Sequence, residues 1–227
     1  MRPDLPFAIP PAWSFGVQLA LVVSIRDEKN MGRVQVKLLA PDTDGEALLW
    51  ARVAVPFAGG DRGAFLIPDV DDEVLITFIA GDPRHPIVIG SLWNGANTPP
   101  ETIPGERVDR WSFTGKNGTR IAIVEESASR ETISFETPSG VSGTLTDEAG
   151  GKIEFVAAGN TVTMGTSGTT IDAPAGVTIK SAKVEVTAGQ VTVNAAMSSF
   201  SGVVRCDLLQ TNSVVSASYT PGAGNIW

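Results

Sequence analysis

The segment from Thr161 to Ala196 constrains the fold of this chain most, because short β-branched pieces recur in it at a near-constant spacing. The pieces begin, in steps of eight, seven, seven and seven residues, at Val162, Thr170, Val177, Val184 and Val191. A seven-residue spacing is typical of coiled coils, but apolar–polar–apolar alternation inside each unit predicts strands. Glycines between the units favour turns. The segment is therefore predicted to be a row of three-to-five-residue strands joined by tight corners, as in a β-solenoid or β-helix.

Strands this short need neighbours that bury one face and pair with their edges. Two arrangements satisfy the repeat. A single chain could complete a solenoid turn every three units, or three copies could wind together, each supplying one face of a triangular prism. The periodicity does not choose between them.

Charge divides the chain into two unlike parts. Of the 42 Asp, Glu, Lys and Arg residues among the 227, 34 lie in 1–150 and 8 in 151–227. This predicts a conventional globular front and an unusual back half. The net charge of −8 argues against a nucleic-acid partner. No apolar run reaches membrane-spanning length, and the first residues lack the features of a signal peptide. The lone Cys206 is expected to be a buried thiol, and the protein is expected to be made in the cytoplasm.

Four segments are predicted along the chain. Residues 1–16 form an extended, proline-rich arm, which is either a disordered leader or a strap onto another subunit through Phe7, Trp13 and Phe15. Residues 17–98 hold five or six strands and no convincing helix, which fits a small closed barrel of the OB type. Residues 99–115 are a polar linker or neck, and residues 116–227 are a β-structured rod with its tip.

Six blocks within the barrel region resemble the central spike family of contractile injection machines, which includes phage baseplate assembly protein V and the valine–glycine-repeat spikes of type VI secretion. The blocks are Gly32–Val36, Trp50–Val53, Phe65–Pro68, Asp72–Leu75, Gly81–Pro86 and Gly90–Gly95. The resemblance is strong over 17–100 and is one of pattern over 115–227.

The resemblance implies an all-β homotrimer, in which three OB barrels are followed by an intertwined β-helix or β-prism rod. It implies a structural role at the centre of a virion tail baseplate or injection-system baseplate, where the spike plugs the tube and pierces the target cell envelope on contraction. The hub or tail-tube protein is then a separate trimer at the N-terminal side, contacted by Phe7, Trp13 and Phe15. Contact with the target membrane would be transient.

The apolar triplet residues are expected to face inward and form the rod core: Val177, Ile179, Val184, Val186, Val191 and Val193. Thr163, Thr178, Thr187 and Thr192 are expected to face outward or lie at corners. At the tip, Tyr219, Ile226 and Trp227 are expected to cover the last layer, or a PAAR-type cap protein closes it. The His-x-His iron site of some spikes is absent, because the single histidine, His85, lies in a barrel turn.

No residue pattern predicts catalysis, a metal or a cofactor, so the protein is not expected to be an enzyme. His85 with Asp82 and Ser91 is explained by turn geometry. The acidic run from Asp69 to Glu73 lacks the spacing of a calcium loop. Trp50 and Trp93 are expected in the barrel core. Two other functions stay open: a β-solenoid tail-fibre or adhesin module that binds surface carbohydrate, and an OB-fold nucleic-acid binder, which would need a basic face.

Overall fold

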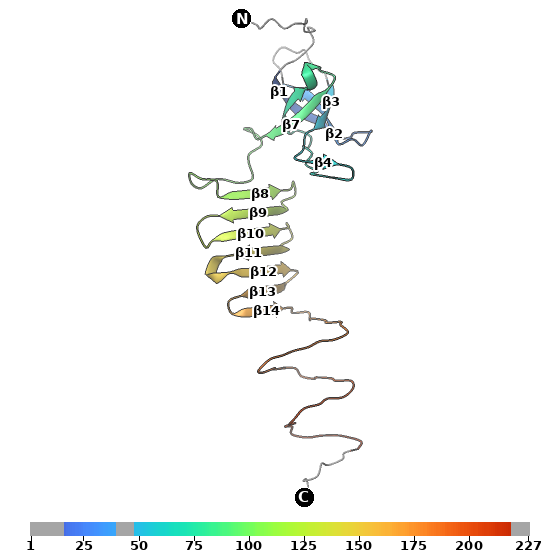
Figure 1. The fold of residues 1–227 in the computed structure, drawn as a ribbon, viewed down its shortest axis with the longest axis vertical. Coiled ribbons are helices and arrows are strands. Elements are labelled where there is room, and N and C mark those ends of the chain that lie inside the picture. Colours follow the sequence, from blue (N-terminus) through green and yellow to red (C-terminus); the bar gives the residue numbers. More distant parts are fainter. Residues whose placement is uncertain (1–15, 40–47, 219–227) are drawn as a thin grey trace. The chain divides into compact units, whose positions relative to one another are not determined.

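The computed structural model describes residues 16–39 and 48–218. The chain divides into two units, residues 1–176 and 177–227, which are described separately. The first unit contains a barrel and a second, larger sheet (Figure 1). Within the described residues, the helical structure consists of two short 3-10 turns, η1 (Ile79–Gly81) and η2 (Glu148–Gly150).

The barrel closes through five strands in the order β1-β2-β3-β7-β6. They are β1 (Val17–Ser24), β2 (Arg33–Leu38), β3 (Leu48–Val53), β6 (Glu73–Phe78) and β7 (Pro86–Leu92). Neighbouring strands are antiparallel except β3 and β7, which pair in parallel. A small hairpin, β4 (Ala58–Gly59) and β5 (Arg62–Gly63), lies between β3 and β6 in the sequence.

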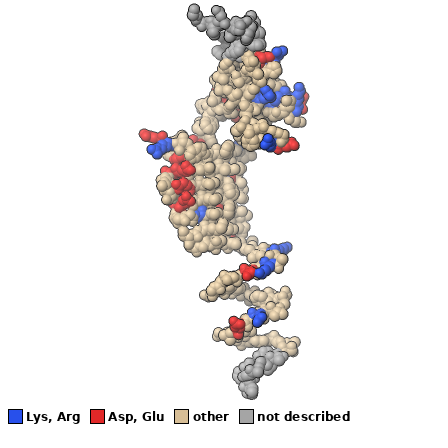
Figure 2. Space-filling view, viewed as in Figure 1, with Lys and Arg blue, Asp and Glu red and all other residues tan. Residues whose placement is uncertain are grey.

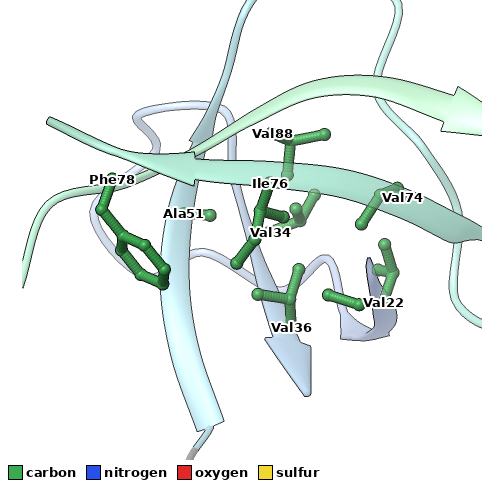
Figure 3. Packing of buried hydrophobic residues seen from close by; sticks show 9 residues of the cluster. Val22, Val34, Val36, Ala51, Val74, Ile76, Phe78 and Val88 are labelled. Carbon is green, nitrogen blue, oxygen red and sulfur yellow. The ribbon is translucent and has the colours of Figure 1, made fainter. Parts of the chain in front are cut away.

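Alternating β-branched residues fill the barrel. Along β6, buried and partly exposed side chains alternate, and in β2 the buried Val34 and Val36 flank the partly exposed Gln35, as period-two alternation requires. Side chains from all five strands meet in this core (Figure 3), which consists of Ala20, Val22, Val34, Val36, Ala51, Val74, Ile76, Phe78 and Val88. The expectation of an all-β fold with an N-terminal five-stranded OB barrel is confirmed.

Asp27 organises the turn between β1 and β2. Its carboxylate accepts hydrogen bonds from the backbone N–H groups of Lys29 and Met31, at 3.1 and 2.8 Å, and binds the Arg33 guanidinium at 2.6 Å. The Arg33 guanidinium, together with the backbone donors, holds the pKa of the Asp27 carboxyl well below its usual range. The turn is therefore tied to the first residue of β2.

The blocks from the sequence comparison occupy the strands and turns of this barrel. In the turn before β7, the Asp82 carboxylate accepts hydrogen bonds from the backbone N–H and side chain of Arg84. At the end of β7, the Asn94 amide donates to Glu73 at 2.8 Å, and its oxygen accepts from two following backbone N–H groups. These polar residues therefore fix loop geometry.

The second sheet is a seven-stranded antiparallel meander, in which each strand pairs with the next along the chain. Its strands are β8 (Arg110–Thr114), β9 (Arg120–Glu125), β10 (Glu131–Glu136), β11 (Ser142–Thr146), β12 (Lys152–Ala157), β13 (Asn160–Gly165) and β14 (Gly168–Asp172). The strand β8 begins within the segment predicted as a neck.

The second unit has no strand among residues 177–218 (Figure 1). The sequence predicts short strands here, and the alternating pattern is present, but a strand requires a hydrogen-bonded neighbour, and this segment has none within the described chain. The apolar pattern is therefore left without the pairing that would make it a sheet.

Three residue-level expectations are wrong in this structure. Trp93 is 68% exposed rather than buried in the barrel core, because β7 ends at Leu92 and the next residue lies past the closed part of the barrel. Trp50 is partly exposed on the outside of β3. Cys206 is exposed rather than buried, because it lies in the extended second unit, whose described residues form no core of their own.

Candidate assembly interface

The strand register gives the seven-stranded sheet one apolar face. Residues directly opposite each other in an antiparallel ladder share a face, and side chains alternate between faces along a strand. The pairing Trp111–Ile123–Ile133–Leu145 therefore runs along one side of the sheet. The apolar face comprises twelve large side chains: Trp111, Phe113, Ile121, Ile123, Ile133, Phe135, Leu145, Ile153, Phe155, Val162, Met164 and Ile171.

The apolar face is not covered by the described part of the chain. Ten of its twelve side chains are more than a third exposed, from Met164 at 36% to Phe113 at 69%. A sheet with one apolar face normally packs it against a second layer. A contiguous apolar surface of this kind marks an interaction site.

Gly143, which has no side chain, leaves a notch in the apolar face, and two neighbouring phenylalanine rings close over it. It occupies the position between Phe135 and Phe155 in the cross-strand row. The two rings lean toward each other over this position, with centroids 6.3 Å apart. A Cβ atom at Gly143 would lie 2.3 Å from Phe135 Cζ, so only glycine allows this ring arrangement.

The opposite face is polar and finds its partners within the chain. One cross-strand row reads Ser134, Thr144, Glu154, Thr163 and Thr170. Lys152 pairs with Glu154 at 2.9 Å, and Arg120 pairs with Glu101 at 2.7 Å. The hydrogen bonds from Arg120, and then from Ser112, hold the pKa of the Glu101 carboxyl below its usual range. The polar face thus pairs these charged groups within the chain, whereas the side chains of the apolar face stay exposed.

An acidic edge borders the apolar face. Glu125 lies opposite Glu131, and Asp147 donates its backbone N–H to the Glu131 carbonyl, so carboxylates follow one another across three strands. Figure 2 shows acidic side chains gathered along one edge of this sheet. Glu131 Oε2 is buried and has no hydrogen-bond partner among the described residues. Like charges directly opposite each other repel, and neither Glu125 nor Glu131 forms an ion pair with a described residue.

The second unit is an extended run with regular bends. The bends fall at Ala182, Gly189, Ala196, Gly202, Asp207, Asn212 and Ala217. Successive steps are thus seven, seven, six, five, five and five residues long. At three bends the preceding hydroxyl donates to the carbonyl two residues on, from Ser181, Thr211 and Ser216. The seven-residue sequence period therefore corresponds to one straight segment and one corner.

The predicted rod-core residues lie in the straight segments of this run. None of the six is buried by the described chain: their exposed fractions run from 59% at Val177 to 71% at Ile179. Alternation places Val177 with Ile179, Val184 with Val186, and Val191 with Val193 on the same side of each segment. Thr178 and Thr192 alternate to the other side. The expected inward role of the six stays a prediction.

Other expected sites lie outside the described residues. These are the arm residues Phe7, Trp13 and Phe15 and the tip residues Tyr219, Ile226 and Trp227. Within the described ranges, no group of three or more His, Cys, Asp or Glu side chains is arranged to hold a metal ion. His85 Nδ1 lies 3.3 Å from the Asp82 carboxylate, which is already bound by Arg84. In residues 16–39 and 48–218, no helix is long and apolar enough to cross a membrane.

Some features of this interface escaped sequence reasoning. The sequence patterns predict neither β8 nor β11, and without these strands the rows of the apolar face are broken. The signal for β8 is the alternation of Trp111 and Phe113 just after the proline-rich segment. The segment of β11, Ser-Gly-Thr-Leu-Thr, holds one large apolar residue, so its strand is evident only from its pairing with β10 and β12.

Comparison with known proteins identifies the barrel. Residues 18–93 match the type VI secretion system/phage-baseplate injector OB domain. The chain is 33% identical over 99 residues to the type VI secretion system spike protein VgrG3 of Vibrio cholerae, a match that covers 40% of this chain and 10% of that protein. It is 31% identical over 113 residues to the spike protein VgrG1a of Pseudomonas aeruginosa, covering 46% of this chain and 18% of that protein.

A further relative is named as a toxin rather than as a spike protein. The chain is 42% identical over 55 residues to the actin cross-linking toxin VgrG1 of Vibrio cholerae, which covers 24% of this chain and 5% of the toxin. The matches thus span less than a fifth of the length of these relatives.

Proposed function

The chain belongs, through its OB domain, to the baseplate spike and VgrG family, and we propose that it is the structural central spike of a contractile phage tail or related injection machine. In this proposal three copies assemble around one axis, and the seven-stranded sheets and the extended runs together form a rod. The observation that carries it is an apolar face and an extended run that one chain leaves without partners.

The apolar face supports the trimer energetically. Fully burying a large apolar side chain contributes about 1.5–3 kcal/mol. The twelve side chains of the apolar face are already partly covered, so burying the remainder would contribute about 1 kcal/mol each, or about 10 kcal/mol per chain. Three such faces turned toward a common axis would form one core, with the three polar faces outside.

The extended run supports intertwining. Backbone N–H and C=O groups need partners when they leave water, and residues 177–218 make no backbone–backbone hydrogen bond within the described chain. Strands from two neighbouring copies would supply these partners and remove the exposed edges. The alternating apolar residues would then stack in layers along the axis, and the shorter steps toward Ala217 would narrow the rod.

The mechanical role follows from the family and from this construction. We propose that the spike plugs the tube and pierces the target envelope on contraction, with a separate hub at its N-terminal side and a possible PAAR-type cap at the other end. Two of the relatives are named spike proteins and one a toxin. Each match covers only part of this chain, so the absence of catalysis is part of the proposal.

Hydrogen–deuterium exchange of the full-length protein tests the intertwined rod. Amides in residues 177–218 should exchange far more slowly than those of an unpaired chain, because each would be bonded to a neighbouring copy. Amides of residues 105–107, which are exposed and make no backbone–backbone hydrogen bond among the described residues, serve as the internal fast reference. Exchange of the run at the reference rate would contradict interchain pairing.

Labelling in the assembled particle tests the role. A gold label on a C-terminal tag should appear on the baseplate axis of contractile particles in electron micrographs. A label on peripheral fibres would instead favour the adhesin alternative.

A further inference from the structure

A basic patch lies on the outside of the barrel, in a chain whose net charge is −8. The basic patch comprises Arg26 and Lys29 of the β1–β2 turn, Arg33 of β2, and Trp50 and Arg52 of β3. Figure 2 shows Lys and Arg side chains gathered on one side of the barrel. Arg26, Lys29 and Arg52 are exposed and make no ion pair with any described residue.

The register concentrates charge within the basic patch. Arg33 lies directly opposite Arg52 in the β2–β3 ladder, so both side chains lie on the same outer face. Like charges at directly opposite positions repel. Asp27 neutralises Arg33 through bonds at 2.6 and 3.2 Å, but no described carboxylate pairs with Arg52. Arg52 is therefore left without a counter-ion among the described residues, and an external anion could supply one.

A hollow in the basic patch joins charge to an aromatic surface. It is lined by Arg26, Glu28, Lys29, Arg33 and Trp50. The Arg33 guanidinium carbon lies 5.4 Å from the centre of the Trp50 ring, a cation–π arrangement that holds both groups in place. The lining offers Arg26 and Lys29, which make no ion pair among the described residues, and a partly exposed indole, beside a single carboxylate, that of Glu28. A ligand complementary to this hollow would carry carboxylates next to an apolar group.

We propose that the basic patch binds an acidic segment of a partner protein. Carboxylates would pair with Arg26, Lys29 and Arg52, and an apolar side chain would contact Trp50. A single-stranded nucleic acid fits less well, because it needs a longer basic track with several free aromatic rings. Here one ring is available and its neighbour Arg33 already covers part of it, while a long polyanion would meet the negative field of the whole chain.

This inference goes beyond the spike role and does not depend on trimer formation, since every residue of the basic patch comes from one barrel. Its failure would leave the assembly unaffected, and the failure of the assembly would leave the basic patch in place.

The test uses the full-length protein and a fluorescein-labelled peptide of glutamates around a central phenylalanine. Anisotropy is measured at low and at physiological salt, with short oligothymidine as the competing probe. The variant Arg26→Gln/Lys29→Gln/Arg52→Gln removes the free cations, which are all exposed. The matched control, Arg62→Gln/Arg107→Gln/Arg205→Gln, removes the same charge from exposed positions elsewhere.

We expect saturable peptide binding that the patch variant weakens by about tenfold or more and the control leaves within about twofold, because paired charges act locally. An equal loss in both variants would reduce the effect to net charge and overturn the proposal. Patch-dependent binding of oligothymidine in preference to the peptide would replace it with a nucleic-acid site. Binding of neither probe would also overturn it.

Discussion

At the scale of single residues, two residues outside the six family-like blocks, Gly143 and Asp27, determine local geometry. Gly143 is absent from any motif, yet it is where the two phenylalanine rings of the apolar face close together. Asp27 belongs to no motif either, and its carboxylate binds both the turn backbone and Arg33. Sequence reasoning identifies such residues as turn or strand formers, because their roles depend on which strands become neighbours.

The substitution Gly143→Val is expected to destabilise the sheet by about 1–3 kcal/mol, because the new side chain overlaps the Phe135 ring and forces it aside. Thermal unfolding followed by circular dichroism measures the change. Gly165→Ala is the control, since a Cβ there meets only ordinary contact at 3.7 Å. Equal melting temperatures for the two variants would show that the notch does not exist in the assembled protein.

The substitution Asp27→Asn is expected to lower barrel stability at neutral pH. The folded pKa of Asp27 is depressed by Arg33, so the ionised carboxylate contributes stability above its ordinary value of about 3.9. That contribution is lost as the pH falls below this value toward the folded pKa, and the variant and the native protein should then converge. Chemical denaturation across about pH 2–7 measures both curves, and the gap between them should narrow only below about pH 3.9.

The control for this pH dependence is Asp61→Asn, at an exposed turn position that makes no ion pair with a described residue. Its curve should run parallel to that of the native protein. A constant gap between Asp27→Asn and the native protein at every pH would contradict the assigned role of the Arg33 contact.

At the scale of elements, alternation predicted most strands, and failed where pairing rather than composition makes the strand. The barrel strands and β9, β10, β12 and β13 follow from alternating apolar residues. β11 holds a single large apolar residue and is a strand through its two neighbours. The segments after Gly176 show the reverse case, in which alternation is clear but no pairing neighbour exists among the residues that the structure describes.

The substitution Val186→Asp tests the direction in which these segments face. If Val186 lies in an interchain core, a buried unpaired carboxylate there costs several kcal/mol and lowers the melting temperature of the trimer. Thr192→Asp introduces the same charge at a position that alternates outward, and its effect should stay within about 0.5 kcal/mol. An unchanged melting temperature for Val186→Asp would refute the inward assignment.

At the scale of the whole molecule, the sequence predicted an all-β chain with a barrel and a repeat region, and the resemblance supplied the trimer. Neither could show that the seven-stranded sheet has one apolar and one polar face, because that division depends on the register of all seven strands. The exposed residues Phe113 and Ile171, at opposite ends of this face, show how far it extends in a single chain. The number of copies in the assembly depends on which surface covers this apolar face.

The mass of the full-length protein in solution tests this account most directly. One chain has a mass of 23.7 kDa, and three times this mass is 71.1 kDa. Light scattering coupled to size exclusion should give a single species near the trimer mass that persists on dilution, because the apolar faces and the extended runs are buried together. A stable monomer near 23.7 kDa would contradict the interwoven spike and favour a chain that closes on itself.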